Sequence, residues 1–369
     1  MRESDLGSIT PYSEIVLKGL LCSNANINLT RLNMSVHYRS PPLRTSRSAR
    51  AKLQKHEVCP SILHTIGETP LVHLSRLFPE FPQAIYGKLE CFNPGGSIKD
   101  RTALNILKRA MKSGALKPGA TVIESSSGNM AIGLALACRY WNFKLIVVFD
   151  PKINTQTLRL LEAYGAEIHQ VSRAEPDSSF LEARLSKVKQ LLSERPNSFW
   201  TDQYHNIDNP GTHQVTMHEI LLQLQGKVDY IFAATSTCGT LMGCADYLSE
   251  RQSKIKMIAV DAKGSVIFGA PEGERMIPGH GAGRESNFLI RSKINQVVHV
   301  SDRECVTGCR QLLAREAILA GGSSGGIVSA VEKTLPHLPP QSSCVMLLCD
   351  RGERYLDTVY NDEWVSQNL

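Results

Sequence analysis

From Ile85 onward, short apolar runs alternate with longer segments in which apolar residues recur at helical spacing. Uninterrupted apolar runs are typical of strands covered on both faces, and helices between such strands are typical of parallel sheets. The pattern therefore predicts an α/β fold with open, mostly parallel sheets and helices on both faces. The runs that we expect to form strands are 121–124, 144–149, 229–234, 256–260 and 344–348.

A tight turn with the sequence P-G-G-S-I-K-D-R (94–101) presents Lys99 at the start of a predicted helix, 102–113. The N-terminus of a helix lowers the pKa of a nearby amine and binds anions. An amine held there can form a Schiff base with an aldehyde cofactor. The other interpretation is a capped helix with a surface lysine, and this motif alone does not separate the two.

Two further polar turns follow predicted strands, which is where ligands bind in open α/β sheets. One is S-S-G-N (126–129), and the other is T-S-T-C-G-T (235–240). Hydroxyls and free backbone N–H groups at a helix start can hold a carboxylate or a phosphate. A serine cap needs only one such residue, and many strand-to-helix turns are rich in small polar residues. Three such turns in one chain, one of them carrying Lys99, favour a ligand site.

The net charge of +6 is concentrated in the first part of the chain. Residues 1–56 hold nine Lys or Arg and three Asp or Glu, whereas the remainder holds 32 of each sign. A neutral body argues against nucleic-acid binding, which needs a folded basic face. The basic N-terminal extension has the composition of an organellar transit peptide, although a disordered tail, or a start at Met34, fits equally well. We therefore expect a cytoplasmic protein, with an organellar location as the alternative.

The other compositional features narrow the protein class. The chain has 369 residues, of which 42% are hydrophobic and 21% charged, as expected for a soluble globular protein. No stretch approaches the roughly 20 apolar residues of a membrane helix. The ten cysteines form no C-x-x-C pair, so we expect reduced thiols and neither a metal site nor a disulfide framework.

Six motifs in order give the chain a resemblance to the fold-type II pyridoxal phosphate enzymes of the cysteine synthase and cystathionine β-synthase family. This resemblance implies a two-domain fold of the tryptophan synthase β type, pyridoxal 5'-phosphate as cofactor, and a homodimer. It implies a large cofactor-binding domain (57–98 and 204–369) and a smaller mobile substrate domain (99–203). The motifs are G-E-T-P-L-V (67–72), N-P-G-G-S-I-K-D-R (93–101), S-S-G-N, T-S-T-C-G-T, G-G-S-S-G-G (321–326) and G-E-R-Y (352–355).

The resemblance also assigns roles to residues. It makes Lys99 the covalent anchor of the cofactor and the group that removes the substrate's α-proton, and Asn129 the partner of the cofactor's phenolic oxygen. Arg351 aligns with the residue that faces the pyridine nitrogen, but it could also point away. The cofactor phosphate is expected at Ser236, Thr237, Cys238, Gly239 and Thr240, and the substrate α-carboxylate at Ser126, Ser127, Gly128 and Asn129.

Several positions depart from the usual sulfhydrylase pattern and suggest a different second substrate. Met130 replaces a threonine, and Ser236 and Cys238 replace two glycines of the phosphate loop. Arg184 lies on the apolar stripe of a predicted helix, 179–194, where a guanidinium must either meet an anion or extend to the helix edge. Tyr204 could complete such an anion pocket.

Three stretches look most like a siderophore-pathway branch of the family, whose members join O-phospho-L-serine to the amine of L-glutamate on the route to 2,3-diaminopropionate. The competing interpretations are a cysteine synthase that uses O-phosphoserine or O-acetylserine with sulfide, and a catalytically silent relative that binds the cofactor. If the chain belongs to the siderophore-pathway branch, we expect Arg184, Tyr204 and Ser236 to discriminate glutamate and phosphoserine from a small thiol and an acetyl ester. The stretches are 202–204, 259–269 and 350–357.

Overall fold

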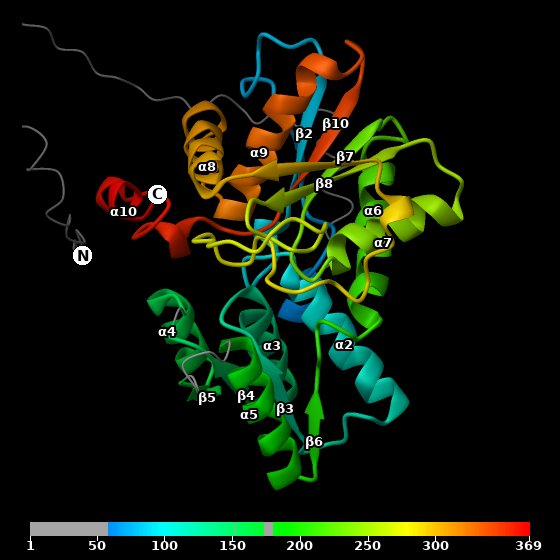
Figure 1. Cartoon of the computed structure of the whole chain (residues 1–369). Coiled ribbons are helices and arrows are strands. Elements are labelled where there is room, and N and C mark those ends of the chain that lie inside the picture. The colour runs from blue at the N-terminus through cyan, green and yellow to red at the C-terminus, as the bar shows by residue number, and fades with distance from the viewer. Residues whose placement is uncertain (1–57, 152, 173–179) are drawn as a thin grey trace, which may run out of the picture. The chain divides into compact units, whose positions relative to one another are not determined.

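The computed structural model describes residues 58–151, 153–172 and 180–369. The chain forms a six-stranded sheet and a four-stranded sheet, and Figure 1 shows the larger sheet above the smaller one. The larger sheet has the order β1-β2-β10-β7-β8-β9, in which β1 is antiparallel to β2 and the other neighbours are parallel. Its strands are β1 (Leu71–His73), β2 (Ala84–Leu89), β7 (Tyr230–Ala234), β8 (Lys256–Ala262), β9 (Gln296–Val300) and β10 (Ser343–Leu348).

The smaller sheet is entirely parallel, with the order β5-β4-β3-β6. Its central strands, β3 and β4, are almost completely buried, which explains their continuous apolar sequences. The five strands expected from apolar runs are confirmed as β3, β4, β7, β8 and β10, and with them the α/β class. The strands of this sheet are β3 (Thr121–Ser125), β4 (Lys144–Phe149), β5 (Glu167–Gln170) and β6 (Ser198–Trp200).

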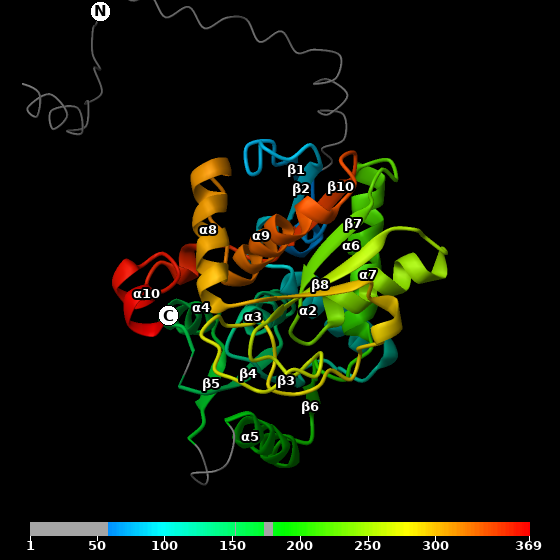
Figure 2. The same cartoon turned by 45° about the horizontal axis from the view of Figure 1, so that its top comes forward.

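Helices cover both faces of the larger sheet. Figure 2 shows α8 and α9 on one side and α6 and α7 on the other, and a separate apolar core fills each interface. The α-helices are α2 (Lys99–Ser113), α3 (Asn129–Trp141), α4 (Thr155–Ala163), α5 (Phe180–Glu194), α6 (Asp208–Gln223), α7 (Gly239–Glu250), α8 (Asp302–Glu316), α9 (Gly322–Thr334) and α10 (Asp362–Asn368). Short 3₁₀ turns lie at Ile62–Thr65 (η1), Glu90–Phe92 (η2), Arg291–Lys293 (η3), Leu335–His337 (η4) and Glu353–Tyr355 (η5).

Helix α2 begins at Lys99, three residues earlier than the expected 102–113. Its buried face repeats at helical spacing through Ala103, Ile106 and Ala110. Gly133 of α3 permits close packing at the first turn, because a Cβ there would lie 3.0 Å from the Lys99 carbonyl oxygen. This contact fixes the start of α2 against the smaller sheet's helical layer.

The strands of the larger sheet come from residues 71–89 and 230–348, and those of the smaller sheet from 121–200. The domain boundaries at 57–98, 99–203 and 204–369 remain a prediction. The basic extension, 1–56, lies outside the described residues. Within the described ranges, no helix is long and apolar enough to cross a bilayer, and no three potential metal ligands cluster.

Candidate active site

Lys99 is the first residue of α2, and a closely packed turn sets its position. Its backbone N–H donates to Ser97 Oγ at 3.2 Å. The Gly95 N–H donates to Asp100 Oδ2 at 2.5 Å, and a Cβ on Gly95 would collide with this carboxylate. Burial raises the pKa of Asp100 to about 7. The turn therefore needs a glycine at position 95 and holds the lysine at a fixed point of the backbone.

The Lys99 amine lies where the loops after three strands meet. Burial lowers its pKa, and the opposing charge effects come from Cys349, Cys238 and Glu124 in that order. These neighbours follow β10, follow β7 and end β3, respectively. The carboxyl ends of strands from both sheets thus surround the half-buried Lys99 amine. Because its pKa is lowered, the amine loses its proton more readily than an exposed lysine does.

The loop after β3 contains the predicted carboxylate site and contacts Arg184 of α5. Arg184 Nη1 donates to Ser127 Oγ at 3.2 Å and forms an ion pair with Asp150 Oδ2 at 3.1 Å. The guanidinium is therefore directed inward, beside the loop, and Asp150 is an anion that it meets there. Its Nε atom is buried without a hydrogen-bond partner among the described residues.

Asn129 begins α3, and the segment after β10 orients its side chain. Its Nδ2 donates to Asp350 Oδ2 at 2.8 Å, and its Oδ1 accepts a hydrogen bond from Arg354 Nη2. Tyr355 donates to the same Asp350 oxygen at 2.6 Å. Residues 350–355, which follow β10 of the larger sheet, therefore orient Asn129 of the S-S-G-N motif, which follows β3 of the smaller sheet.

The loop after β7 forms a polar cradle at the start of α7. Cys238 has a φ of +64°, a left-handed conformation that favours glycine. Gly239 packs so closely that a Cβ there would lie 2.2 Å from Asn209 Oδ1. The Ser236 hydroxyl makes no hydrogen bond to another described residue, whereas Thr240 Oγ1 lies 3.2 Å from His213 Nε2. Unused hydroxyl and N–H donors at a helix start suit a phosphate.

Tyr204 lies between β6 and α6, half-buried, with the Arg284 guanidinium 4.2 Å from its ring centre. Burial raises the pKa of Tyr204, and the positive charges of Arg184, Arg284 and Arg275 oppose that shift. The structure thus brings Tyr204 into the field of Arg184, as the sequence suggested. It adds two arginines from a loop that has no periodic pattern and gave no sequence signal.

Arg351 is directed outward. Its side chain is exposed, packs over Gly96 and donates from Nε to the Cys91 carbonyl at 2.8 Å. Ser323, which the sequence patterns did not single out, is buried at the start of α9 and close enough to the Cys349 thiol beside Lys99 to oppose the rise in its pKa. The signal that could have found it is the G-G-S-S-G-G motif at a helix start.

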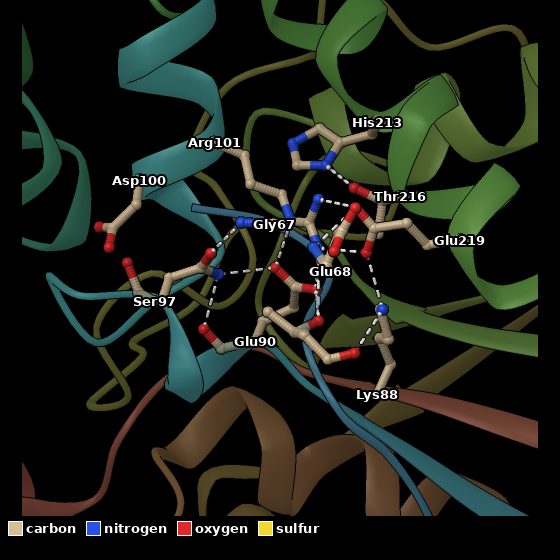
Figure 3. Close-up of polar contacts among 12 residues, drawn as sticks. Gly67, Glu68, Lys88, Glu90, Ser97, Asp100, Arg101, His213, Thr216 and Glu219 are labelled. Carbon is tan, nitrogen blue, oxygen red and sulfur yellow. Dashed lines mark hydrogen bonds and ion pairs between the residues drawn. The ribbon is translucent and has the colours of Figure 1, made fainter. Parts of the chain in front are cut away.

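A buried ion network, drawn in Figure 3, supports the turn from behind. Arg101 lies 2.7 Å from Glu90 and 2.6 Å from Glu219, and Lys88 lies 2.8 Å from the other oxygen of Glu219. Two cations and two anions balance, as burial requires. The Glu68 N–H donates to Glu219 at 3.0 Å, so the network also fixes the G-E-T-P segment.

Comparisons with known proteins agree with this geometry. The family model described as "Pyridoxal-phosphate dependent enzyme" matches residues 62–350. An N-(2-amino-2-carboxyethyl)-L-glutamate synthase of Ralstonia nicotianae is 43% identical over 311 residues, covering 84% of this chain and 92% of its own. The Cupriavidus metallidurans protein of the same name is 44% identical over 315 residues, with the same two coverages.

Solved structures of related enzymes have the same fold. O-acetyl serine sulfhydrylase isoform 3 of Entamoeba histolytica superposes with a TM-score of 0.78 at 31% identity, covering 83% of this chain and 92% of its own. The O-acetylserine dependent cystathionine β-synthase of Helicobacter pylori gives a TM-score of 0.77 at 30% identity, with coverages of 83% and 100%. The chain therefore belongs to the pyridoxal-phosphate dependent enzymes, in the cysteine synthase and cystathionine β-synthase family.

Proposed function

We propose that this protein joins O-phospho-L-serine to L-glutamate, giving N-(2-amino-2-carboxyethyl)-L-glutamate and phosphate. The bond between the serine β-carbon and the phosphate oxygen breaks, and a bond to the glutamate nitrogen forms. The glutamate ammonium group gives up one proton, which the departing phosphate takes up, and the product nitrogen remains a secondary ammonium group. The product then serves 2,3-diaminopropionate and siderophore formation.

The observation that carries this proposal is the position of Arg184 at the substrate loop. Its guanidinium contacts Ser127, and Ser127 belongs to the loop expected to hold the substrate carboxylate. Sulfide and an acetyl ester gain little from a guanidinium, whereas phosphoserine and glutamate both carry extra negative groups. The identity to two synthases of that name supports the same substrates.

The residues present fit pyridoxal phosphate. The loop 236–240 offers the hydroxyls and helix start that a phosphate needs, and Gly239 lets α7 begin closely packed against Asn209. Lys99 supplies an amine whose pKa is lowered by burial, which favours its reaction with an aldehyde. When bound, the cofactor draws electrons from the amino acid joined to it and makes the α-proton acidic.

The chain's own groups have separate roles in proton transfer, substrate binding and cofactor binding. Lys99 Nζ, with its lowered pKa, accepts the α-proton at neutral pH and can return it. The N–H groups of Ser127 and Asn129, at the positive end of α3, bind the α-carboxylate, since the N–H groups of Ser126 and Gly128 already donate to the Val148 carbonyl and to Ser126 Oγ. We assign the ring nitrogen to the Ser323 hydroxyl rather than to Arg351, because the guanidinium is directed toward Cys91. The homodimer and the domain division expected from the family form part of the same proposal.

The test offers purified protein O-phosphoserine with glutamate, with sulfide, or with both. We expect mass spectrometry to identify the glutamate adduct and a molybdate assay to find one phosphate for each adduct. Lys99→Ala should abolish both products and the visible absorbance of the bound cofactor. Cysteine formation without any adduct contradicts the proposal and indicates a cysteine synthase. Cofactor absorbance without turnover of either mixture indicates a silent relative.

A further inference from the structure

Arg275 and Arg284 lie in the long segment between β8 and η3, here called the arginine segment. Figures 1 and 2 show it in yellow, passing between β8 and the four-stranded sheet. Ser286 Oγ donates to the Thr237 carbonyl at 2.7 Å, which fixes the segment against the predicted phosphate loop. Arg284 lies two residues before Ser286, and the Arg275 guanidinium reaches Gly283 beside it, so both arginines lie near the predicted phosphate loop.

Neither arginine has an anionic partner among the described residues. Arg275 Nη1 is buried without a hydrogen bond, and no ion pair involves Arg275 or Arg284. Arg284 instead lies over the ring of Tyr204, 4.2 Å from its centre. The Glu272 carboxylate and the Arg275 guanidinium both lie beside Gly283, but the two groups do not form an ion pair. Two partly buried guanidinium groups without an anionic partner are suited to bind an anionic ligand.

Arg184, whose charge also acts on Tyr204, differs from these two arginines. Its Nη1 pairs with Asp150 at 3.1 Å and its buried Nε is left for a substrate group, whereas Arg275 and Arg284 have no anionic partner among the described residues. A phosphate monoester carries about −1.5 to −2 at neutral pH, which matches two guanidinium groups better than a single carboxylate does. An uncharged acetyl ester has no use for them.

We propose that Arg275 and Arg284, beside Tyr204, bind the phosphate of O-phosphoserine and determine the preference for this leaving group. The inference rests on the proposed function and names two specificity-determining residues for it. As the bond from the β-carbon to the bridging oxygen breaks, its electron pair stays with the phosphate. The two guanidinium groups stabilise the charge that the departing inorganic phosphate gains.

The experiment uses the cofactor-loaded enzyme without glutamate, so that only the first half of the reaction is measured. Arg275→Gln, Arg284→Gln and Arg284→Lys are titrated with O-phosphoserine and with O-acetylserine, following the cofactor absorbance and the release of phosphate or acetate. Inorganic phosphate serves as a competing probe. Arg303→Gln, on the exposed first turn of α8, removes one positive charge outside the site and is the matched control.

We expect each Gln variant to raise the half-saturating O-phosphoserine concentration about 10- to 100-fold, the size of a lost charge-assisted hydrogen bond. Inhibition by inorganic phosphate should weaken in parallel, and use of O-acetylserine should stay within about twofold. Arg284→Lys should retain part of the preference, since the charge remains without the fork. Arg303→Gln should give the same half-saturating concentrations as the unmodified enzyme. Without substrate, all variants should show the cofactor spectrum of the unmodified enzyme.

Two results overturn the inference: unchanged use of O-phosphoserine, or equal losses with both esters. Equal losses mean that the two arginines have a structural role. A failure of the proposed function gives a different result. If the enzyme uses O-phosphoserine in an Arg284-dependent way but never forms the glutamate adduct, the proposed function is wrong and the phosphate site is supported.

Discussion

The Asn129 amide donates to the Asp350 carboxylate at 2.8 Å, joining the start of α3 to the segment after β10. The two residues are far apart in sequence and belong to motifs around different sheets. The hydrogen bond sets the direction of the amide expected to face the cofactor. Asp350 therefore acts as a positioning residue for Asn129.

Replacing Asp350 by Ala should lower kcat/KM for O-phosphoserine by about tenfold or more, because it frees the Asn129 side chain and leaves buried donors unpaired. Steady-state kinetics, with the cofactor spectrum as a second measurement, provide the test. Tyr355→Phe is the control, since it removes another hydrogen bond to Asp350 Oδ2 and leaves the Asn129 contact in place. Equal losses in both variants would show that Asp350 acts only through general stability.

Glu219 should make folding stability depend on pH at the acid end. Burial raises its pKa, but the hydrogen bonds and charges of Arg101 and Lys88 outweigh burial and hold it at about 2, against an ordinary 4.5. A depressed folded-state pKa means that this stabilisation is complete above about 4.5 and is lost as the pH falls toward 2. Urea unfolding across this range should therefore show a steeper acid loss in the unmodified protein than in Glu219→Gln. Parallel curves would contradict the assignment.

Gly133→Ala should destabilise the protein by about 1 to 3 kcal/mol, the usual cost of overpacking a core. The added methyl group would lie 3.0 Å from the Lys99 carbonyl oxygen and 3.1 Å from the Ala103 Cβ. Gly211→Ala in α6 is the matched control, because nothing lies within 4 Å of its added methyl group. That change should stabilise the helix by about 0.5 to 1 kcal/mol. Thermal unfolding should therefore show a lower melting temperature for Gly133→Ala and a higher one for Gly211→Ala than for the unmodified protein.

Cys238 should prefer glycine to alanine, unlike an ordinary helical cysteine. At its φ of +64°, a side chain costs about 1 to 2 kcal/mol, so Cys238→Gly should be more stable than Cys238→Ala by about that amount. Cys244, inside α7, should show the reverse order by about 1 kcal/mol. Denaturant unfolding of the four variants tests both orders. If the Ala variant were more stable than the Gly variant at both positions, the backbone of Cys238 would not be strained.

The sequence predicted those parts of the fold in which one local pattern decides the outcome. Strands β3 and β4 are apolar throughout because both faces are buried, and Arg184 stood out because it interrupts a helical stripe. Strands β5 and β6 are short and only partly buried, so E-I-H-Q and S-F-W carry no clear pattern.

Other features depend on partners distant in sequence. Lys88 is fully buried in β2, and only the folded chain brings it to Glu219, 131 residues away. Arg275 and Arg284 lie in an irregular segment, where spacing predicts no direction for a side chain. The outward direction of Arg351 depends on the Cys91 carbonyl, a backbone group that no sequence pattern reveals.

The surroundings of Lys99 also decide which nucleophile meets an aldehyde. Two thiols, Cys238 and Cys349, lie close enough to influence its charge, and a thiolate would compete with the amine for the same carbon. Burial raises the pKa of both thiols to about 12, so both stay protonated and unreactive at neutral pH. The same burial lowers the pKa of the amine. Burial thus keeps both sulfur atoms protonated and favours the unprotonated, nucleophilic amine, so that Lys99 reacts with the aldehyde and the thiols do not.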